Sequence, residues 1–62
     1  MNGYYSKVIE ILRKHSFTFL RQGKGSHEIW TNGPVDITVP FNCESRHTAN
    51  GIMKDAGIKH HF

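Results

Sequence analysis

The chain has 62 residues, enough for one hydrophobic core and too few for a multidomain enzyme. Eight Lys and Arg residues against five Asp and Glu give a net charge of +3 with histidine neutral, which favours an acidic partner. A single cysteine excludes an internal disulfide framework, and no apolar run has the length of a signal peptide or membrane span. We therefore expect one soluble, cytoplasmic domain over residues 1–62 that depends on packing for its stability.

The first predicted element is an amphipathic helix that begins near Tyr5. Apolar residues recur at helical spacing from Tyr5 to Leu12, which places them on one stripe of the helix. The two basic residues that follow suit the negative end of a helix dipole, so the helix is predicted to end by His15, with this histidine as a cap. Ser6 is an alternative cap for its start.

Three β-strands are predicted next, joined by short turns. The turn Gly23–Ser26 is rich in glycine, and Asn32–Pro34 combines residues that tolerate positive φ with a proline. The third strand alternates apolar and polar residues, the pattern of a strand with one buried face, and Pro40 ends it or marks an edge. The strands are predicted at Phe17–Arg21, His27–Thr31 and Val35–Val39.

A second helix closes the predicted fold. The stretch Phe41–His47 follows neither periodicity and is predicted as a loop. Beyond it, apolar residues return at helical spacing up to Ala56, and Gly57 suits the left-handed position that ends a helix. Either Ser45 or Thr48 is expected to cap the start of this helix.

The order helix, strand, strand, strand, helix predicts an α+β fold. Hairpin-length links leave no crossover long enough for a parallel pair, so the three-stranded sheet is expected to be antiparallel, with both helices on one face. Ile58 is expected to fold back onto the core, and Lys59–Phe62 to form a short basic tail without order. The predicted core contains Ile9, Leu12, Ile37, Val39, Ile52 and Met53.

The turn before the second strand carries residue types that suit phosphate chemistry. It combines two glycines with Lys24, Ser26 and His27. Glycine lets backbone N–H groups approach a phosphate, and an imidazole can act as general acid or base near neutral pH. A flexible hairpin turn with a surface histidine explains the same residues, and the Walker spacing for nucleoside triphosphates is absent.

Other reactive residues form weaker patterns. Cys43 and His47 are four residues apart, and His60 and His61 lie near the C-terminus, but the paired spacings of structural zinc are absent, so no metal site is predicted. Cys43 would need His47 as its base to act as a nucleophile, and an unreactive thiol is the simpler interpretation. Trp30 could stack on a nucleobase, although aromatic residues in a small domain are more often core.

Three short motifs, taken in order, resemble the HicA family of toxin mRNA interferases. They are Gly25-Ser26-His27, Thr38-Val39-Pro40 and Ala56-Gly57-Ile58. The resemblance extends over nearly the whole chain, from the first helix to Ile58. It implies a fold like the double-stranded RNA-binding domain, ribosome-independent cleavage of mRNA, His27 as the catalytic residue and a HicB-type antitoxin as partner. Glu28 stands where a second histidine often follows, which leaves a one-histidine mechanism as the simplest.

We therefore expect the toxin of a type II toxin–antitoxin system, an endoribonuclease that arrests growth and needs no metal or cofactor. His27 would take or give a proton while the 2′-hydroxyl of the RNA attacks the adjacent phosphate. The alternative is a non-catalytic RNA-binding module of the same fold, and a structural interaction protein ranks third. The expected substrate-binding residues are Arg21, Lys24, Gly25, Ser26 and Arg46.

Overall fold

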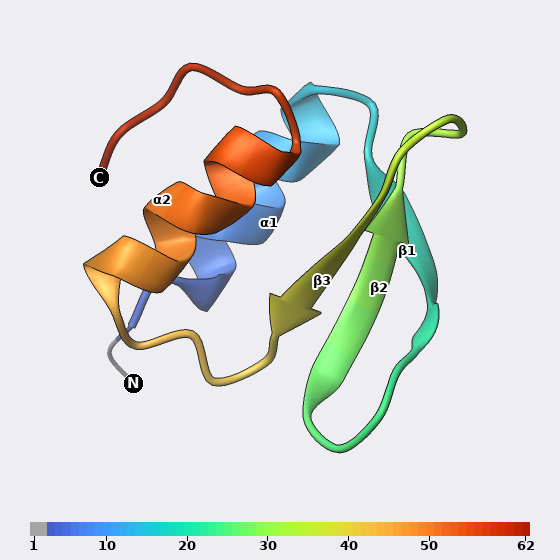
Figure 1. The fold of residues 1–62 in the computed structure, drawn as a ribbon, viewed down its shortest axis with the longest axis horizontal. Helices are drawn as coiled ribbons and strands as arrows, with labels where there is room; N and C mark the ends of the chain where they lie inside the picture. Colours follow the sequence, from blue (N-terminus) through green and yellow to red (C-terminus); the bar gives the residue numbers. More distant parts are fainter. Residues whose placement is uncertain (1–2) are drawn as a thin grey trace.

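Residues 3–62, described by a computed structural model, form two helices packed on a three-stranded sheet. The elements in chain order are α1 (Tyr5–Lys14), β1 (Thr18–Gln22), β2 (His27–Thr31), β3 (Asp36–Pro40) and α2 (Arg46–Asp55). The sheet is antiparallel in the order β1-β2-β3, and both helices lie on one side of it (Figure 1). The predicted α-β-β-β-α fold class is confirmed. Neither helix of the described chain is long and apolar enough to cross a membrane.

The sheet has one face toward the helices and one exposed face. Trp30 of β2 pairs with Ile37 of β3, and both side chains are buried against the helix layer. Val39 is buried on the same face, two residues along β3. Because side chains alternate along a strand, His27, three residues before Trp30, belongs to the exposed face. Pro40 is its partner across β2 and β3.

The core contains five of the six residues that the sequence predicts there. Ile9 is the exception, because Val8 takes the fully buried position on α1 and Ile9 packs only partly buried against the core. Phe17, Trp30 and Cys43 were not in the predicted core, yet each is at most 3% exposed. The complete cluster is Val8, Leu12, Phe17, Trp30, Ile37, Val39, Cys43, Ala49, Ile52, Met53 and Ile58.

Strands β1 and β3 both begin and end one residue later than predicted. Phe17 precedes β1, and its N–H donates to the Leu12 carbonyl at 2.9 Å, so it belongs to the end of α1. Val35 belongs to the turn before β3, because its N–H donates to Asn32 Oδ1 at 2.9 Å, and it is 38% exposed. Pro40 is the last residue of β3, an edge strand, so both predicted roles of this proline are confirmed.

The ends of α2 follow the capping expected from the sequence, but the helix begins earlier. Ser45 is the N-cap: its Oγ accepts hydrogen bonds from the N–H groups of His47 at 3.2 Å and Thr48 at 3.5 Å. Arg46 and His47, predicted as loop, therefore form the first turn of the helix. Gly57, at φ 74°, follows the last turn as predicted.

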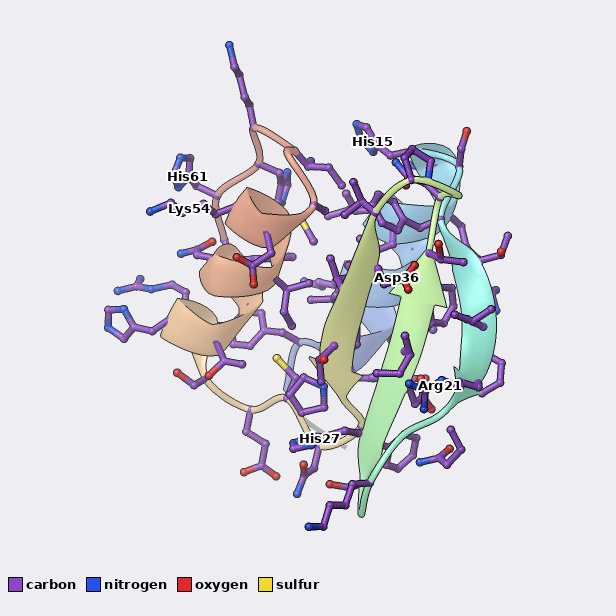
Figure 2. The ribbon with its side chains drawn as sticks, turned by 45° about the vertical axis from the view of Figure 1, so that its right-hand side comes forward. His15, Arg21, His27, Asp36, Lys54 and His61 are labelled. Atoms are coloured by element: carbon purple, nitrogen blue, oxygen red, sulfur yellow. The ribbon has the colours of Figure 1, made fainter. Side chains whose placement is uncertain are left out.

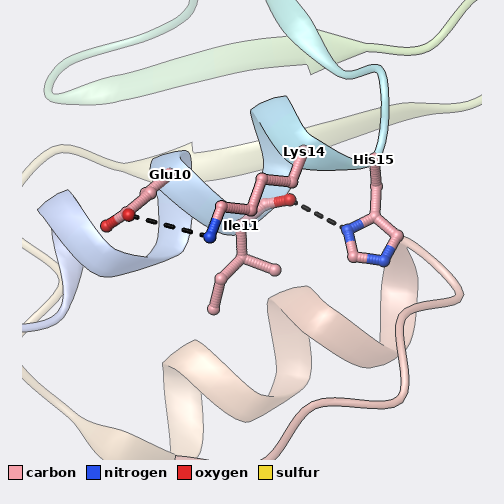
Figure 3. Close-up of polar contacts among 4 residues, drawn as sticks. All are labelled: Glu10, Ile11, Lys14 and His15. Atoms are coloured by element: carbon pink, nitrogen blue, oxygen red, sulfur yellow. Dashed lines mark hydrogen bonds and ion pairs between the residues drawn. The ribbon is translucent and has the colours of Figure 1, made fainter.

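The end of α1 is confirmed, and its alternative start is wrong. His15 is the C-cap residue, and its Nδ1 lies 2.9 Å from the carbonyl oxygen of Ile11 (Figure 3). At the other end Tyr4 is the N-cap and makes no side-chain capping hydrogen bond, while Ser6 lies inside the helix. Ser16, directly after the cap, adopts φ 70°, a conformation that more commonly belongs to glycine.

The last residues of the chain pack on the helices, so the predicted tail without order is wrong. The Phe62 N–H donates to Asn50 Oδ1 of α2 at 2.8 Å. The Phe62 ring meets the Tyr4 ring edge-on, with centroids 5.3 Å apart. Figure 1 shows this segment running back beside α2 from its C-terminal end. The tail is therefore fixed at Phe62, while His60 and His61 before it remain exposed.

Candidate active site

The hairpin between β1 and β2 holds the predicted catalytic motif in a tight turn. The side-chain amide of Gln22 donates to the carbonyl oxygens of Gly25 at 3.2 Å and His27 at 2.9 Å. The N–H of His27 donates to the Lys24 carbonyl at 3.1 Å. Gly25 has φ 63°, and a Cβ added there would meet nothing within 4 Å, so the backbone is open to a ligand on that side. Lys24, Ser26 and His27 are exposed around it.

The end of β3 supports this hairpin from the other side. The Phe41 N–H donates to the Ser26 carbonyl at 2.7 Å, and Pro40 pairs with His27 in the sheet. The motif Gly25-Ser26-His27 and the motif that ends in Pro40 are therefore neighbours in the fold, although the second comes some ten residues later in the sequence.

A β-bulge brings Arg21 to the same face as His27. Phe19 pairs with Trp30 on the helix side, and strict alternation would place Arg21 on that side too. The register shifts between Phe19 and Arg21, so that Arg21 pairs with Ile29 on the exposed face. Figure 2 shows Arg21 and His27 toward the same end of the sheet.

The polar ends of these exposed side chains are not committed to other protein groups. Within residues 3–62, no hydrogen bond or ion pair occupies the Arg21 guanidinium, the Lys24 ammonium or the His27 imidazole. Arg46, the fifth predicted binding residue, is exposed at the first position of α2, and nothing of this kind joins it to the hairpin in the described chain. The fold thus brings Arg21, Lys24, Gly25, Ser26 and His27 together and leaves Arg46 on a separate element.

Glu28, next to His27, faces the helices. Its Oε1 accepts hydrogen bonds from the Tyr5 hydroxyl at 2.6 Å and from Trp30 Nε1 at 3.0 Å. The first bond connects α1 to β2 next to His27, and the second lies within β2. Glu28 therefore has a structural role, on the face opposite His27. Sequence reasoning missed this role because the pairing of Glu28 with Tyr5 spans 23 positions.

The Tyr5–Glu28 hydrogen bond predicts a loss of stability at alkaline pH. Burial raises the pKa of Tyr5 to about 12 from 10.0, with the bond to Glu28 and its charge adding to the shift. The folded state favours the neutral phenol, so this stabilisation is complete below pH 10.0 and is lost as pH rises through about 12. Urea unfolding across this window should show a steeper decline for the parent chain than for Tyr5→Phe. Parallel declines would contradict this assignment.

Cys43 and Trp30 are buried, which excludes two of the alternatives. Burial raises the pKa of the Cys43 thiol, and a buried neutral thiol is a poor nucleophile. Its sulfur lies 4.0 Å from the Ser45 carbonyl oxygen, whereas His47 is exposed on α2. Trp30 is 2% exposed, so its ring is not available to stack on a base. Among residues 3–62, no three His, Cys, Asp or Glu side chains gather as possible metal ligands.

The sequence match agrees with this arrangement of elements. Residues 5–58 match the sequence model of a protein family described as HicA toxin of bacterial toxin-antitoxin. This span covers both helices, all three strands and the hairpin that carries His27. No curated protein and no solved structure matches the chain. Because the match extends over most of the 62 residues, the chain belongs to the HicA family of toxins from bacterial toxin–antitoxin systems.

Proposed function

We propose that this toxin is an endoribonuclease that cleaves mRNA without the ribosome and uses His27 for proton transfer. The observation that supports it best is an exposed imidazole on the same sheet face as a cation, beside a turn whose backbone is open at Gly25. RNA contains its own nucleophile, so such a site needs only to orient the strand, move protons and stabilise charge.

The reaction is an in-line attack of a ribose 2′-oxygen on the adjacent phosphorus. The bond from the 2′-oxygen to phosphorus forms, and the bond from phosphorus to the 5′-oxygen breaks. The 2′-hydroxyl loses a proton and the departing 5′-oxygen gains one, which leaves a 2′,3′-cyclic phosphate and a 5′-hydroxyl. His27 performs the first proton transfer or the last.

The neighbouring residues would bind the reacting phosphate. Gly25 has no side chain to obstruct the backbone N–H groups, and Ser26 can donate a hydrogen bond from its hydroxyl. Lys24 and Arg21 would stabilise the charge that develops on the phosphate oxygens. Arg46, on α2, would contact a phosphate further along the strand.

Membership of a toxin–antitoxin family implies an antitoxin partner. We propose that this partner is of the HicB type and that it covers the face with His27 during growth. Co-purification with the product of the adjacent open reading frame tests this proposal. A neighbouring protein that neither binds the toxin nor restores growth would contradict it.

Purified toxin incubated with labelled single-stranded RNA tests the proposed activity. The expected result is cleavage that persists in EDTA and leaves 5′-hydroxyl ends. Binding without cleavage would instead support the non-catalytic RNA-binding module, and fragments with 5′-phosphate ends would exclude attack by the 2′-oxygen. Neither result would affect the family assignment, which rests on the sequence match.

A further inference from the structure

We propose that two grooves beside the C-terminal tail bind the sugar–phosphate backbone of the RNA substrate, away from the hairpin with His27. The inference rests on the proposed function. The tail is held between the grooves by the Phe62 contacts to Asn50 and Tyr4. One groove is lined by Asn50, Gly51, Lys54, Ile58, Lys59, His60 and His61. The other is lined by Lys7, Glu10, Ile11, Lys14, His60, His61 and Phe62. We call them together the tail grooves.

The tail grooves account for the net positive charge of the whole protein. Four lysines and one glutamate line them, a balance of +3, which equals the net charge of the chain. The other four Lys and Arg residues are matched in number by four Asp and Glu residues. A large share of the charge that favours an acidic partner therefore lies along these grooves.

The single carboxylate of the grooves neutralises little of this charge. Lys14 Nζ lies 3.9 Å from Glu10 Oε2 (Figure 3), and both side chains are about two-thirds exposed, at 71% and 67%. An exposed pair of this kind is weak and screened by salt. Lys54 and His61 both line the other groove, and Figure 2 shows them near each other. The lysines thus remain available for a ligand with several negative charges.

A nucleic acid strand fits this surface better than an acidic protein patch. The positive charge is divided over two grooves on both sides of the tail, which suits the regular charges of a phosphate backbone. The exposed His60 and His61 lie between the grooves. The His60 ring meets the Phe62 ring edge-on, with centroids 4.6 Å apart, and the His61 ring offers a planar surface against which a base can stack. The longest extent of the molecule is 29 Å, so a short RNA segment reaches both the tail grooves and the hairpin.

Binding of a fluorescein-labelled single-stranded RNA to His27→Ala protein tests the inference without cleavage. Adding Lys54→Gln and Lys59→Gln should raise the Kd roughly tenfold and reduce the slope of log K against log salt by about 1.4, that is, about 0.7 for each lost phosphate contact. The matched control, Lys54→Arg with Lys59→Arg, keeps the charge and should retain the slope. Unchanged affinity and slope in the Gln variant would overturn the proposal.

A second pair of variants separates a local effect from a general change in charge. Glu10→Gln removes the carboxylate of the grooves and should tighten RNA binding about twofold or more. Asp36→Asn removes the same charge at the start of β3, outside the grooves, and should have the smaller effect. Equal effects would contradict a local site. If Lys54→Gln with Lys59→Gln weakens binding of the antitoxin and not of RNA, the grooves belong to the protein partner and the proposal is wrong.

These outcomes are distinguishable from failure of the proposed function. Wild-type toxin that leaves RNA intact contradicts the nuclease activity, and RNA binding by the grooves is then measured independently. If wild-type toxin cleaves RNA and the Gln variant binds RNA normally, the proposed nuclease activity stands and the tail grooves are excluded as an RNA-binding site. In the variants with altered grooves, cleavage by toxin that retains His27 should show a higher KM and an unchanged kcat.

Discussion

The substitution His27→Ala is expected to lower the rate of RNA cleavage by about two to four orders of magnitude, the usual contribution of general acid–base catalysis. The physical reason is the position of His27 on the exposed face of the sheet, with an imidazole that no protein group occupies within residues 3–62. Its backbone, not its side chain, accepts and donates the hydrogen bonds of the hairpin. Alanine should therefore preserve the turn while removing the proton-transfer group.

Three measurements separate loss of catalysis from loss of structure. The far-ultraviolet circular dichroism and antitoxin binding of His27→Ala should match the parent protein, and single-turnover cleavage should not. His27→Gln, which keeps hydrogen-bonding groups but transfers no proton, should be as defective as His27→Ala. The control is His47→Ala, which removes an exposed imidazole at the start of α2 and should leave cleavage unchanged. If folded His27→Ala cleaves RNA rapidly and His47→Ala does not, the proposed proton transfer would belong to His47 and not to His27.

Much of the fold was predictable because local patterns in this chain agree with its tertiary structure. The alternation through Ile37 and Val39 identifies the buried face of β3, and Gly57 identifies the end of α2. The boundaries of β1 and β3 were wrong by one residue because hydrogen bonds of the preceding helix end and turn take the first predicted residue of each strand. The Phe17 N–H bonds to the Leu12 carbonyl at the end of α1. The Asn32 side chain accepts a hydrogen bond from the N–H of Val35, and the periodicity of apolar residues does not reveal such a contact.

The features that sequence reasoning missed depend on contacts between distant residues or on unusual backbone. The bulge between Phe19 and Arg21 leaves no glycine or proline as a signal, yet it decides which face of the sheet carries Arg21. Ser16 adopts φ 70° where a glycine would have indicated the end of the helix. The contact of Phe62 with Tyr4 joins the two ends of the described chain, so the order of the tail follows from tertiary packing.

The candidate site shows the same division between local and tertiary information. The turn at Gly25 follows from local sequence and was predicted. The exposure of His27 follows from strand alternation once Trp30 is found on the buried face. The role of Glu28 was not predicted, because the side chain could have faced either side of β2 until its bond to Tyr5 was known. The charge of the tail grooves was visible as scattered lysines, but only the packing of the tail brings them together.

The substitution Ile37→Ala is expected to reduce the free energy of unfolding by roughly 2 to 4 kcal/mol. Ile37 is 5% exposed on β3, and it pairs with the buried Trp30 across the sheet. Alanine removes most of this side chain and leaves a cavity that the small core can fill only in part. A chain of 62 residues has a total stability of about 3 to 9 kcal/mol, so the loss should be a large fraction of it.

Val35→Ala is the matched control for Ile37→Ala, because it also truncates a β-branched residue but lies one position before β3 and is 38% exposed. Its cost should be within about 0.5 kcal/mol, and equal urea midpoints for the two variants would show that the core assignment is wrong. Ile37 is buried on the helix side and pairs with Trp30, three residues from His27, so Ile37→Ala should reduce cleavage only through the unfolded fraction. At low temperature, where the variant is folded, its rate per folded molecule should approach that of the parent. His27→Ala should remain inactive under the same conditions, which distinguishes a residue that stabilises the sheet from one that performs the chemistry.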